Sequence, residues 1–309
     1  MDLFSAMQTV VKVAELGSFS QAAQALQLPN ASVSARVARL EDRLGVKLFS
    51  RTTRQVRLTE EGAAYLEWAQ RLLAEIGEVE DQLRGRHRKP RGRIRVDVPA
   101  SAGRHVIAPA LPDFLERYPD ITVDLGCTDR PVDLVAEGVD CAIRGGGVVD
   151  EGLVARRLGT FQVITCAAPA YLARHGVPES PRALDGHRAV NFFSAKTGKV
   201  MPLEFQVDGH AETIDLKHQA GTNDADTYLA LVEQGLGLAQ FPLSGLTVRA
   251  LAEGRLVEVL ADWRPEGFPL FVVYARNRHL GARVRAFVDW SVELYTRIFG
   301  ELAERRSRE

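Results

Sequence analysis

Between Asn30 and Arg54 the chain concentrates amide, hydroxyl and guanidinium side chains that could recognise nucleic acid. Asparagine and arginine form paired hydrogen bonds with base edges, whereas arginine, serine and threonine also bind phosphate. The candidates for base contacts are Asn30, Ser32, Ser34 and Arg36, and Arg39 is a further DNA-binding candidate. The candidates for phosphate or minor-groove contacts are Arg51, Thr52, Thr53 and Arg54. Each arginine alone would fit an ordinary surface position, so the hypothesis depends on the cluster.

The formal charge is divided unevenly along the chain. Residues 1–95 carry 16 basic and 11 acidic side chains, and the remainder carries 23 and 29, although the net charge is only -1. Seven basic residues lie between Arg36 and Arg57, and seven more between Arg84 and Arg95. A basic N-terminal third favours a polyanionic partner, but a solvated charged surface would have the same composition.

The apolar spacing predicts three helices that position these side chains. Apolar residues recur every three or four positions from Leu3 to Ala14, and Gly17 follows as a C-cap. Ser18 and Ser20 can cap a short second helix at about residues 22–26. A third helix is expected from residue 31 to 44, ending at Gly45, with an inward stripe of Val33, Val37, Leu40 and Leu44.

The second and third of these helices are joined by a tight break at Pro29. Two short helices joined in this way predict a helix-turn-helix at about residues 19–38, whose second helix would enter the major groove. Two strands, at residues 46–49 and 56–58, would follow as a wing with its tip at residues 51–54. Such a wing suits phosphate or minor-groove contacts.

A long helix is expected after Thr59, which can act as its N-cap. Its apolar residues form about three heptads of an a/d seam: Tyr65, Ala69, Leu72, Ile76, Val79 and Leu83. Packing against its own domain is the alternative, but we expect no other N-terminal element to cover this seam. The heptads therefore predict a dimerisation helix, followed by a Gly-, Pro- and Arg-rich hinge at residues 85–92.

From Ile94 onward the pattern becomes short apolar strands alternating with helices, which favours an α/β domain with a mainly parallel sheet. The elements expected in a first lobe are strands at 94–98, 121–125 and 141–144 and helices at 106–118 and 132–137. Those expected in a second lobe are strands at 161–167, 189–193, 214–218 and 238–241 and a helix at 225–234. A strand at 270–274 and a helix at 283–299 would return to the first lobe.

Several runs resemble the LysR family of transcriptional regulators. In the N-terminal segment they are Gly17-Ser18-Phe19-Ser20-Gln21-Ala22-Ala23, Val33-Ser34, Leu40-Glu41-x-x-Leu44-Gly45-Val46-x-Leu48-Phe49-x-Arg51 and Leu58-Thr59-x-x-Gly62. The C-terminal runs that are similar to the effector domain of this family are residues 140–144, 153–158 and 168–172. Pro29 and Ala35 depart from the common family pattern, so no base preference is carried over.

The resemblance implies a multidomain α and α/β fold. It comprises a winged helix-turn-helix at residues 1–59, a linker and dimerisation helix at 60–84, a hinge at 85–92 and a two-lobed periplasmic-binding-protein-like (type II) α/β effector domain at 93–300. Lobe I would span residues 93–160 and 267–300, and lobe II residues 161–266. The implied function is a sequence-specific regulator whose C-terminal domain senses a small molecule.

In such two-lobed folds, ligands bind between the lobes, at strand ends and helix N-termini. Position then nominates Ser101, Thr128 and Arg144 in lobe I. In lobe II it nominates Phe193, Ser194, Thr222, Asn223 and Phe241. Each of these residues could instead be structural, and Arg144 could form an internal ion pair.

Enzyme motifs, a metal-ligand pattern and a membrane span are not apparent in the sequence, so no catalysis, cofactor or metal is expected. Cys127, Cys141 and Cys166 lie in apolar runs and are expected to be reduced core residues, with redox sensing as the alternative. The expected location is the cytoplasm. The expected partners are double-stranded DNA, a small-molecule effector, a second copy in a homodimer or homotetramer, and RNA polymerase. The alternative functions are a constitutive DNA binder without ligand, and a small-molecule binding protein or transferase with an incidental helical head.

Overall fold

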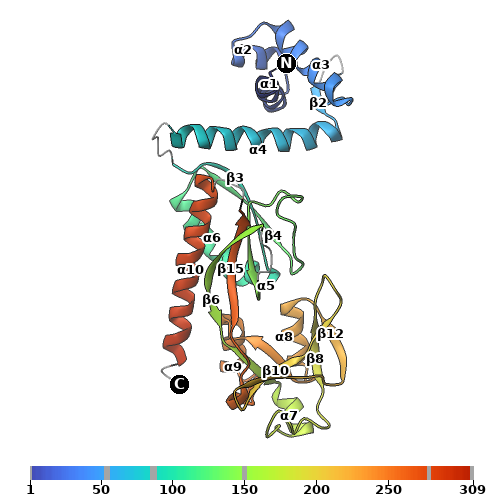
Figure 1. The fold of residues 1–309 in the computed structure, drawn as a ribbon, viewed down its shortest axis with the longest axis vertical. Helices are drawn as coiled ribbons and strands as arrows, with labels where there is room; N and C mark the ends of the chain where they lie inside the picture. Colours follow the sequence, from blue (N-terminus) through green and yellow to red (C-terminus); the bar gives the residue numbers. More distant parts are fainter. Residues whose placement is uncertain (1, 52–55, 84–88, 148–151, 277–279, 307–309) are drawn as a thin grey trace. The chain divides into compact units, whose positions relative to one another are not determined.

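The computed structural model describes residues 2–51, 56–83, 89–147, 152–276 and 280–306 (Figure 1). The chain divides into two compact units, Met1–Arg88 and Lys89–Glu309, called here the N-terminal and C-terminal units. Among the described residues, no helix combines the length and the apolar character that crossing a bilayer requires.

Three helices open the N-terminal unit: α1 (Leu3–Leu16), α2 (Phe19–Leu26) and α3 (Asn30–Leu44). The predicted C-caps Gly17 and Gly45 have left-handed φ values of 61° and 71°, which glycine adopts without steric cost. The Ser18 hydroxyl accepts the Gln21 amide hydrogen and caps α2, as predicted. The three helices are therefore confirmed, with α2 starting about one turn earlier than expected.

The three helices enclose one apolar core made of Ala6, Val10, Val13, Ala22, Ala23, Val33, Val37, Leu40, Leu48 and Phe49. Leu44 was expected to belong to the inward stripe of α3, but it is 41% exposed. The expectation is wrong because Leu44 is the last residue of α3, where the chain turns away at Gly45.

The wing is an antiparallel pair of β1 (Phe49–Arg51) and β2 (Val56–Leu58), with Phe49 opposite Leu58. The first strand therefore begins three residues later than predicted. The amides of Leu48 and Phe49 donate to the carboxylate of Glu41, so this stretch is bound to α3 instead of a strand partner. The predicted tip residues Thr52, Thr53 and Arg54 lie outside the described residues.

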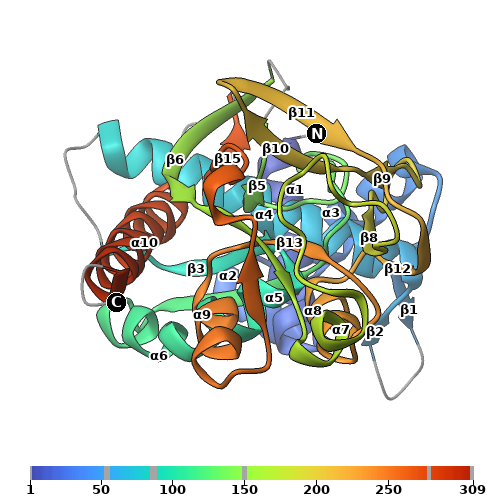
Figure 2. The ribbon, with the colours of Figure 1, turned by 90° about the horizontal axis from the view of Figure 1, so that it is seen from below.

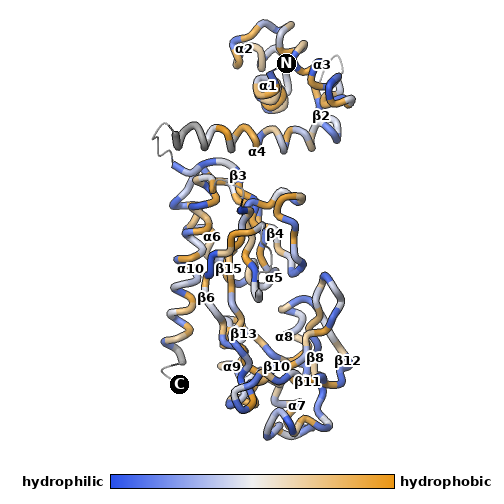
Figure 3. The backbone as a smooth tube through the Cα atoms, in the orientation of Figure 1, coloured by the Kyte–Doolittle hydropathy of each residue, from blue (hydrophilic) through white to orange (hydrophobic). Residues whose placement is uncertain are grey.

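The long helix α4 (Glu60–Leu83) follows, capped by Thr59, whose hydroxyl accepts the Gly62 amide hydrogen at 2.9 Å. The expectation that no element covers its seam is wrong for the first turns, because α1 packs against α4. Tyr65 packs against the apolar core and Ala69 is only 1% exposed. Among the described side chains of α4, the large apolar ones that are exposed are Trp68, Leu72 and Ile76. The middle turns of this helix are hydrophobic (Figure 3).

Lobe I of the C-terminal unit is built on a five-stranded sheet in the order β4-β3-β5-β15-β6. Its strands are β3 (Gly92–Val98), β4 (Ile121–Cys127), β5 (Cys141–Gly145), β6 (Leu153–Phe161) and β15 (Phe268–Ala275). Strands β4 and β5 pair with β3 in parallel, whereas β15 is antiparallel to β5 and β6. The chain therefore leaves lobe I after β6 and returns to it in β15.

Two helices, α6 (Ala108–Arg117) and α10 (Ala282–Arg306), pack together against this sheet (Figure 1, Figure 2). Their contact includes Phe114, whose ring centroid lies 5.5 Å from that of Phe287 and 5.2 Å from that of Trp290. The helix expected at 106–118 begins earlier, because α5 (Ala100–Ala102) and a π-helical turn (Gly103–Ile107) lead directly into α6.

One expectation for lobe I is wrong, and one strand was missed. The segment expected as a helix at 132–137 forms turns, because only one helical backbone bond forms, from the Glu137 amide to the Asp133 carbonyl, before Gly138 with a left-handed φ of 69° ends it. Strand β6 was not predicted, because it lacks regular alternation: its middle residues 155–157 are exposed in succession on an edge strand.

Lobe II contains strands β7 to β14 in two three-stranded sheets and one hairpin. The strands are β7 (Val163–Ala167), β8 (Ala189–Phe193), β9 (Val200–Met201), β10 (Leu203–Val207), β11 (His210–Ile214), β12 (His218–Thr222), β13 (Ala239–Pro242) and β14 (Val257–Val259). The helices are α7 (Pro169–His175), α8 (Ala225–Glu233) and α9 (Gly245–Ala252), with a short 3-10 turn at Ala261–Trp263.

The strand expected at 214–218 is wrong, because this segment connects β11 to β12. Residues Asp208 and Gly209, with φ values of 52° and 80°, turn the chain so that β11 pairs with β10. Leu216 packs against the core of lobe II from this connection.

Candidate nucleic-acid interface and ligand site

Helix α3 displays its five DNA-binding candidates at different depths. Asn30 and Arg39 are exposed, whereas Ser32, Ser34 and Arg36 are half-buried. Because successive residues turn by about 100°, Asn30 and Ser34 lie on one side of the helix and Ser32 and Arg39 on the other. Each of these two pairs therefore lies along one edge of the exposed face of α3.

Small side chains occupy the middle of that exposed face. Residues Ala31, Ala35 and Ala38 lie between the two polar edges, opposite the buried Val33 and Val37. A face of alanines flanked by polar groups lets a helix approach a groove closely while its edges form hydrogen bonds.

The charge of Arg36 acts on the carboxyl group that caps α1. The Ser5 hydroxyl donates to Asp2 and lowers the pKa of its carboxyl group, and the charge of Arg36 lowers that pKa further.

Glu41 joins α3 to the wing. Its carboxylate is 4% exposed and accepts the amide hydrogens of Leu48 at 2.9 Å and Phe49 at 3.2 Å, together with the Lys47 ammonium at 2.9 Å. Burial pushes the pKa of Glu41 up, but these hydrogen bonds hold it below its ordinary value of 4.5. The carboxylate thereby fixes the wing relative to the exposed face of α3.

The start of α4 is also held against the segment before the wing. The Thr59 hydroxyl donates to the Lys47 carbonyl at 2.5 Å, and a Cβ on Gly62 would lie 1.9 Å from the Leu48 carbonyl oxygen. Only glycine allows this approach. The motif residues Glu41, Thr59 and Gly62 therefore fix the geometry of the surface and need not touch DNA. Of the wing candidates, the backbone of Arg51 is described as the end of β1.

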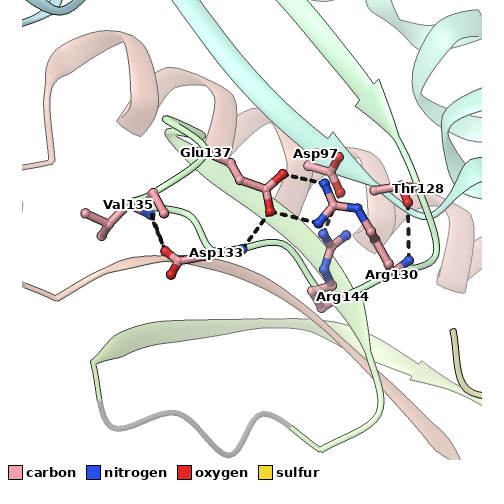
Figure 4. A network of polar contacts seen from close by, with 8 residues as sticks. Asp97, Thr128, Arg130, Asp133, Val135, Glu137 and Arg144 are labelled. Atoms are coloured by element: carbon pink, nitrogen blue, oxygen red, sulfur yellow. Dashed lines mark hydrogen bonds and ion pairs between the residues drawn. The ribbon is translucent and has the colours of Figure 1, made fainter. Parts of the chain in front are cut away.

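In the C-terminal unit, the carboxyl ends of β3, β4 and β5 carry a network of charged groups (Figure 4). Arg144 Nη2 donates to Asp97 Oδ1 at 2.5 Å, and Arg144 Nη1 donates to the Ile143 carbonyl at 2.9 Å. The alternative considered for Arg144, an internal ion pair, is therefore observed. Burial raises the pKa of Asp97 more than the hydrogen bond from Arg144 lowers it.

Arg130 forms the second part of this network. Its guanidinium binds both carboxylate oxygens of Glu137, at 2.8 and 2.5 Å, in the fork geometry that favours such pairs. The Thr128 hydroxyl accepts the Arg130 amide hydrogen at 3.3 Å (Figure 4). Thr128 and Arg144 thus belong to one polar edge of the lobe I sheet.

Asp129 lies at the same edge and is half-buried. Its carboxylate accepts the Ala100 amide hydrogen at 3.2 Å. Burial raises its pKa, the Ala100 hydrogen bond opposes this, and the charges of Asp224 and Asp226 raise the pKa further. Carboxylates from lobe II therefore act on this edge of lobe I.

The lobe II candidates are only partly brought together. Strands β8 and β12 are parallel, and Thr222 pairs with Phe192, so Phe193, Ser194, Thr222 and Asn223 lie at one end of this pair. The Ser194 hydroxyl accepts the amide hydrogens of Lys196 and Thr197 in a tight turn. Phe241 lies near the end of β13 (Ala239–Pro242), as expected, but its side chain is only 6% exposed and packs on the ring of Tyr228 in the lobe core.

One contact joins the two lobes at the candidate site. Arg104 Nη1 donates to Asp226 Oδ2 at 2.7 Å, and His105 Nε2 lies 3.1 Å from Asp226 Oδ1. Helix α5, which carries Ser101, packs against α8 of lobe II. Helix α8 begins just after Thr222 and Asn223, so Ser101 belongs to the lobe I element next to these two residues.

Sequence analysis missed Asp97, Arg104, Asp129 and Asp226. Asp97 could have been noticed as a carboxylate within an apolar strand, and Asp226 as an acid in the first turn of α8. The partners of these four residues are 29 to 122 residues away in the chain, so no local pattern indicates the pairs.

The cysteine expectation is correct for Cys141 and Cys166, which are buried and reduced, and wrong for Cys127, which is exposed. Cys127 is the last residue of β4, where the buried part of the strand has ended. Burial raises the pKa of its thiol nonetheless. Within the described ranges, no three His, Cys, Asp or Glu side chains are grouped as metal ligands would be.

Comparisons with known proteins match both units. Residues 4–63 match the model of bacterial regulatory helix-turn-helix proteins of the lysR family, and residues 87–295 match the LysR substrate binding domain. An HTH-type transcriptional repressor of Pseudomonas aeruginosa is 41% identical over 300 residues, covering 96% of this chain and 93% of the relative.

Two solved structures are similar along nearly the whole chain. CrgA, a LysR-type transcriptional regulator from Neisseria meningitidis, has a TM-score of 0.59 at 34% identity, covering 94% of this chain and 98% of CrgA. Full-length AphB, a virulence activator of Vibrio cholerae, has a TM-score of 0.56 at 25% identity, covering 95% and 99% of the respective chains.

Proposed function

The chain belongs to the LysR family of transcriptional regulators, with a DNA-binding helix-turn-helix and an effector-binding C-terminal domain, and we propose that α3 reads its operator as one of a pair. The functional division would be a winged helix-turn-helix at 1–59, a linker helix at 60–84, a hinge at 85–92 and an effector domain at 93–300. Lobe I would comprise 93–160 and 267–300, and lobe II 161–266.

The exposed face of α3 is the observation that best supports the proposed DNA-binding surface. Its small central residues would face the major groove, while Asn30, Ser32, Ser34 and Arg39 would reach bases or phosphates from its edges. Arg36, on the same helix, would reach a base edge or a DNA phosphate. The wing residues Arg51, Thr52, Thr53 and Arg54 would contact phosphate or the minor groove.

Replacing Arg39 tests this surface. In fluorescence anisotropy with operator DNA, Arg39→Ala should weaken binding about tenfold and reduce the salt dependence by about one charge. Arg249→Ala, which removes an exposed arginine of α9 paired with Glu253, is the matched control and should bind as the wild type does. Equal affinity of both variants would contradict the proposed surface.

The second copy would dock on α4. Trp68, Leu72 and Ile76 are 51%, 38% and 40% exposed, and their spacing of four residues places them on one face of the helix. Exposed apolar side chains in a row are unfavourable in water, and a second α4 would cover them. We therefore propose a homodimer, with Val79 and Leu83 extending the seam, and a homotetramer as the higher assembly.

Sedimentation of Leu72→Asp tests the dimer. This substitution should yield monomers, since it places a charge in the apolar face, whereas Gln70→Asp, also exposed on α4 but on the opposite side, should remain dimeric. A dimer that persists in Leu72→Asp would exclude this face.

The effector would bind between the strand ends of the two lobes. Lobe I would contribute Ser101, Thr128 and Arg144, and lobe II Phe193, Ser194, Thr222 and Asn223. The ion pair of Arg104 with Asp226 joins the lobes beside this site, so a ligand that favours one arrangement of the lobes would shift their equilibrium. Through the linker helix, that shift would change the spacing of the paired N-terminal units.

Thermal unfolding in the presence of small acids, amino acids and aromatic compounds tests the effector site. A true effector should raise the midpoint of the wild type and much less that of Ser101→Trp, which would occupy the site. No stabilisation by any compound would favour a constitutive DNA binder. A DNA-binding regulator of this kind would act in the cytoplasm, with RNA polymerase as a further partner.

A further inference from the structure

A carboxamide without a hydrogen-bond partner lies in strand β8 of lobe II. Asn191 is only 9% exposed, and its side chain forms no hydrogen bond within the described part of the chain. Unlike the phenolic oxygen of Tyr295, which also lacks a partner there, its amide atoms are not fully closed off from solvent. A carboxamide offers both donors and an acceptor, so a buried one normally bonds to protein, water or ligand.

The orientation of Asn191 follows from the alternation of side chains along β8. Val190 and Phe192 pack into the apolar cluster that includes α8, so Asn191 and Phe193 project from the opposite face of the strand. Strand β8 ends at Phe193, and its parallel neighbour β12 ends at Thr222. Asn191 therefore lies on the same face as Phe193, beside the strand ends of the proposed effector site.

The neighbouring strand offers bare backbone beside these two side chains. Gly221 of β12 pairs with Asn191 and is exposed. A Cβ on Gly221 would lie 3.5 Å from Asn191 Cβ and 3.7 Å from Phe193 Cδ1, so both side chains border the place that a larger residue would occupy. A flat aromatic group can rest there against the ring of Phe193, with a polar group beside the carboxamide.

A second carboxamide on the adjacent strand shows the contrast. Gln240 and Asn191 each lie two residues beyond the parallel bridge that joins β13 to β8. Both polar atoms of Gln240 are engaged: Nε2 donates to Thr165 Oγ1 at 3.1 Å and to the Glu204 carbonyl at 2.6 Å, and Oε1 accepts the Glu204 amide hydrogen at 2.9 Å. The fold thus satisfies one of the two carboxamides and leaves the other for a ligand.

We propose that Asn191 is a specificity-determining residue of the effector site, and that the effector is a small aromatic compound with a neutral carboxamide-like group. That group would present an adjacent acceptor and donor to Asn191, while the ring lies against Phe193 and Gly221. This inference rests on the proposed effector site and adds the chemistry that selects its ligand. A site that offers both a donor and an acceptor discriminates against a compound of the same shape that lacks one of them.

Benzamide and acetophenone are matched probes, because they share the ring and the carbonyl and differ only in the amino or methyl group beside it. In ligand-observed NMR titrations of the full-length protein, benzamide should bind at least about fivefold more tightly than acetophenone. Asn191→Leu keeps the approximate size but removes the hydrogen bonds, so it should bind the two probes alike. Absence of benzamide binding, or an unchanged preference in Asn191→Leu, would overturn the proposal.

A blocking variant locates the bound probe. Gly221→Val fills the place beside Asn191 and should weaken benzamide binding at least about tenfold. Gln219→Val, at another exposed position of β12, should leave it unchanged. Because Gly221→Val leaves Asn191 in place, it also tests the site if Asn191→Leu does not fold. Unchanged benzamide binding in folded Gly221→Val would contradict the proposal.

Phe193→Leu separates the role of Asn191 from that of the effector site as a whole. This variant should weaken both probes by a similar factor and keep the preference for benzamide. Equal binding of the two probes to the wild type, with both weakened by Phe193→Leu, would keep the effector site and overturn the role of Asn191. Operator binding by Arg39→Ala involves none of these residues, so the DNA-binding proposal is tested separately.

Discussion

The two candidate sites are assembled in different ways. In the N-terminal unit, the residues that form and fix the surface lie between Asn30 and Gly62, on α3, the wing and the start of α4. In the C-terminal unit, the ion pairs join Asp97 with Arg144 and Arg104 with Asp226, which are 47 and 122 residues apart. The first site depends on caps, turns and close approaches within a short segment. The second depends on the strand order that brings distant segments together.

The largest effect is expected where the N-terminal unit allows no side chain. Gly62→Ala would place a Cβ 1.9 Å from the Leu48 carbonyl oxygen, so α4 must move away from the wing. We expect a loss of about 3 kcal/mol or more in the free energy of unfolding of this unit. Calorimetry with Gly77→Ala as the control would measure it.

Gly77 lies on the same helix, and a Cβ there would meet no atom within 4 Å. Gly77→Ala should therefore stabilise α4 by about 0.5 to 1 kcal/mol. Equal effects of the two substitutions would mean that the approach of Gly62 to Leu48 is not a constraint.

The next effect concerns the pair at the strand ends of lobe I. Arg144→Met leaves the Asp97 carboxylate, which is only 5% exposed, without its cation. We expect the C-terminal unit to lose about 2 to 3 kcal/mol of stability at pH 7. The double variant Asp97→Asn/Arg144→Met should be more stable than Arg144→Met alone, and urea unfolding of the two variants would measure the difference.

The pH dependence of Arg144→Met has a defined sign. Without Arg144 the pKa of Asp97 rises further above its ordinary 3.8, so the folded state favours the protonated carboxyl group. Relative to the wild type, the destabilisation should therefore be small below the wild-type folded pKa, which itself lies above 3.8, and should grow as the pH rises from there to the higher folded pKa of the variant. A loss that is independent of pH would show that Asp97 is not the group left uncompensated.

A smaller effect is expected from the carboxylate that ties α3 to the wing. Glu41→Gln keeps the shape of the side chain but removes the charge that Lys47 and two backbone amides bind. We expect the free energy of unfolding to fall by about 1 to 2 kcal/mol at pH 7. Because the folded pKa of Glu41 is lowered, its stabilisation is complete above pH 4.5 and is lost as the pH falls through the folded pKa.

Thermal unfolding between pH 3 and 7 would follow this difference. The Glu41→Gln curve should converge with that of the wild type in acid, whereas Asp42→Asn, at an exposed position, should change stability by less than about 0.5 kcal/mol throughout. A constant gap between Glu41→Gln and the wild type would contradict the role given to the Glu41 charge.

The smallest stability effect is expected at the contact between the lobes. Arg104 is 69% exposed, so Asp226→Asn should cost less than about 1 kcal/mol. Hydrogen exchange should nevertheless quicken severalfold for the first amides of α8 and for α5, with α1 to α3 unchanged. Unchanged exchange in α5 and α8 would mean that the ion pair does not hold these elements together.

These differences also explain what could be predicted from the sequence. Helices α1 to α3 and the caps Ser18, Gly17 and Gly45 follow from local rules, and the structure confirms them. The strand at 214–218 was wrong and β6 was missed, because strand identity depends on partners that are distant in the chain.

The same limit applies to individual site residues. Ala69 has the spacing of a dimer seam, but α1 covers it, and Phe241 ends a predicted strand, but its ring belongs to the core of lobe II. The pairing of Asp226 with Arg104 could not be predicted, because only the packing of α5 on α8 brings the two residues together.

The central claim, that paired N-terminal units read specific DNA through α3, is tested most directly by selecting binding sites from random double-stranded DNA with the full-length protein. The account predicts that one sequence is enriched as two related half-sites, with centres about 34 Å or one helical turn apart. Recovered DNA without a common sequence, or with a single unrepeated half-site, would contradict it.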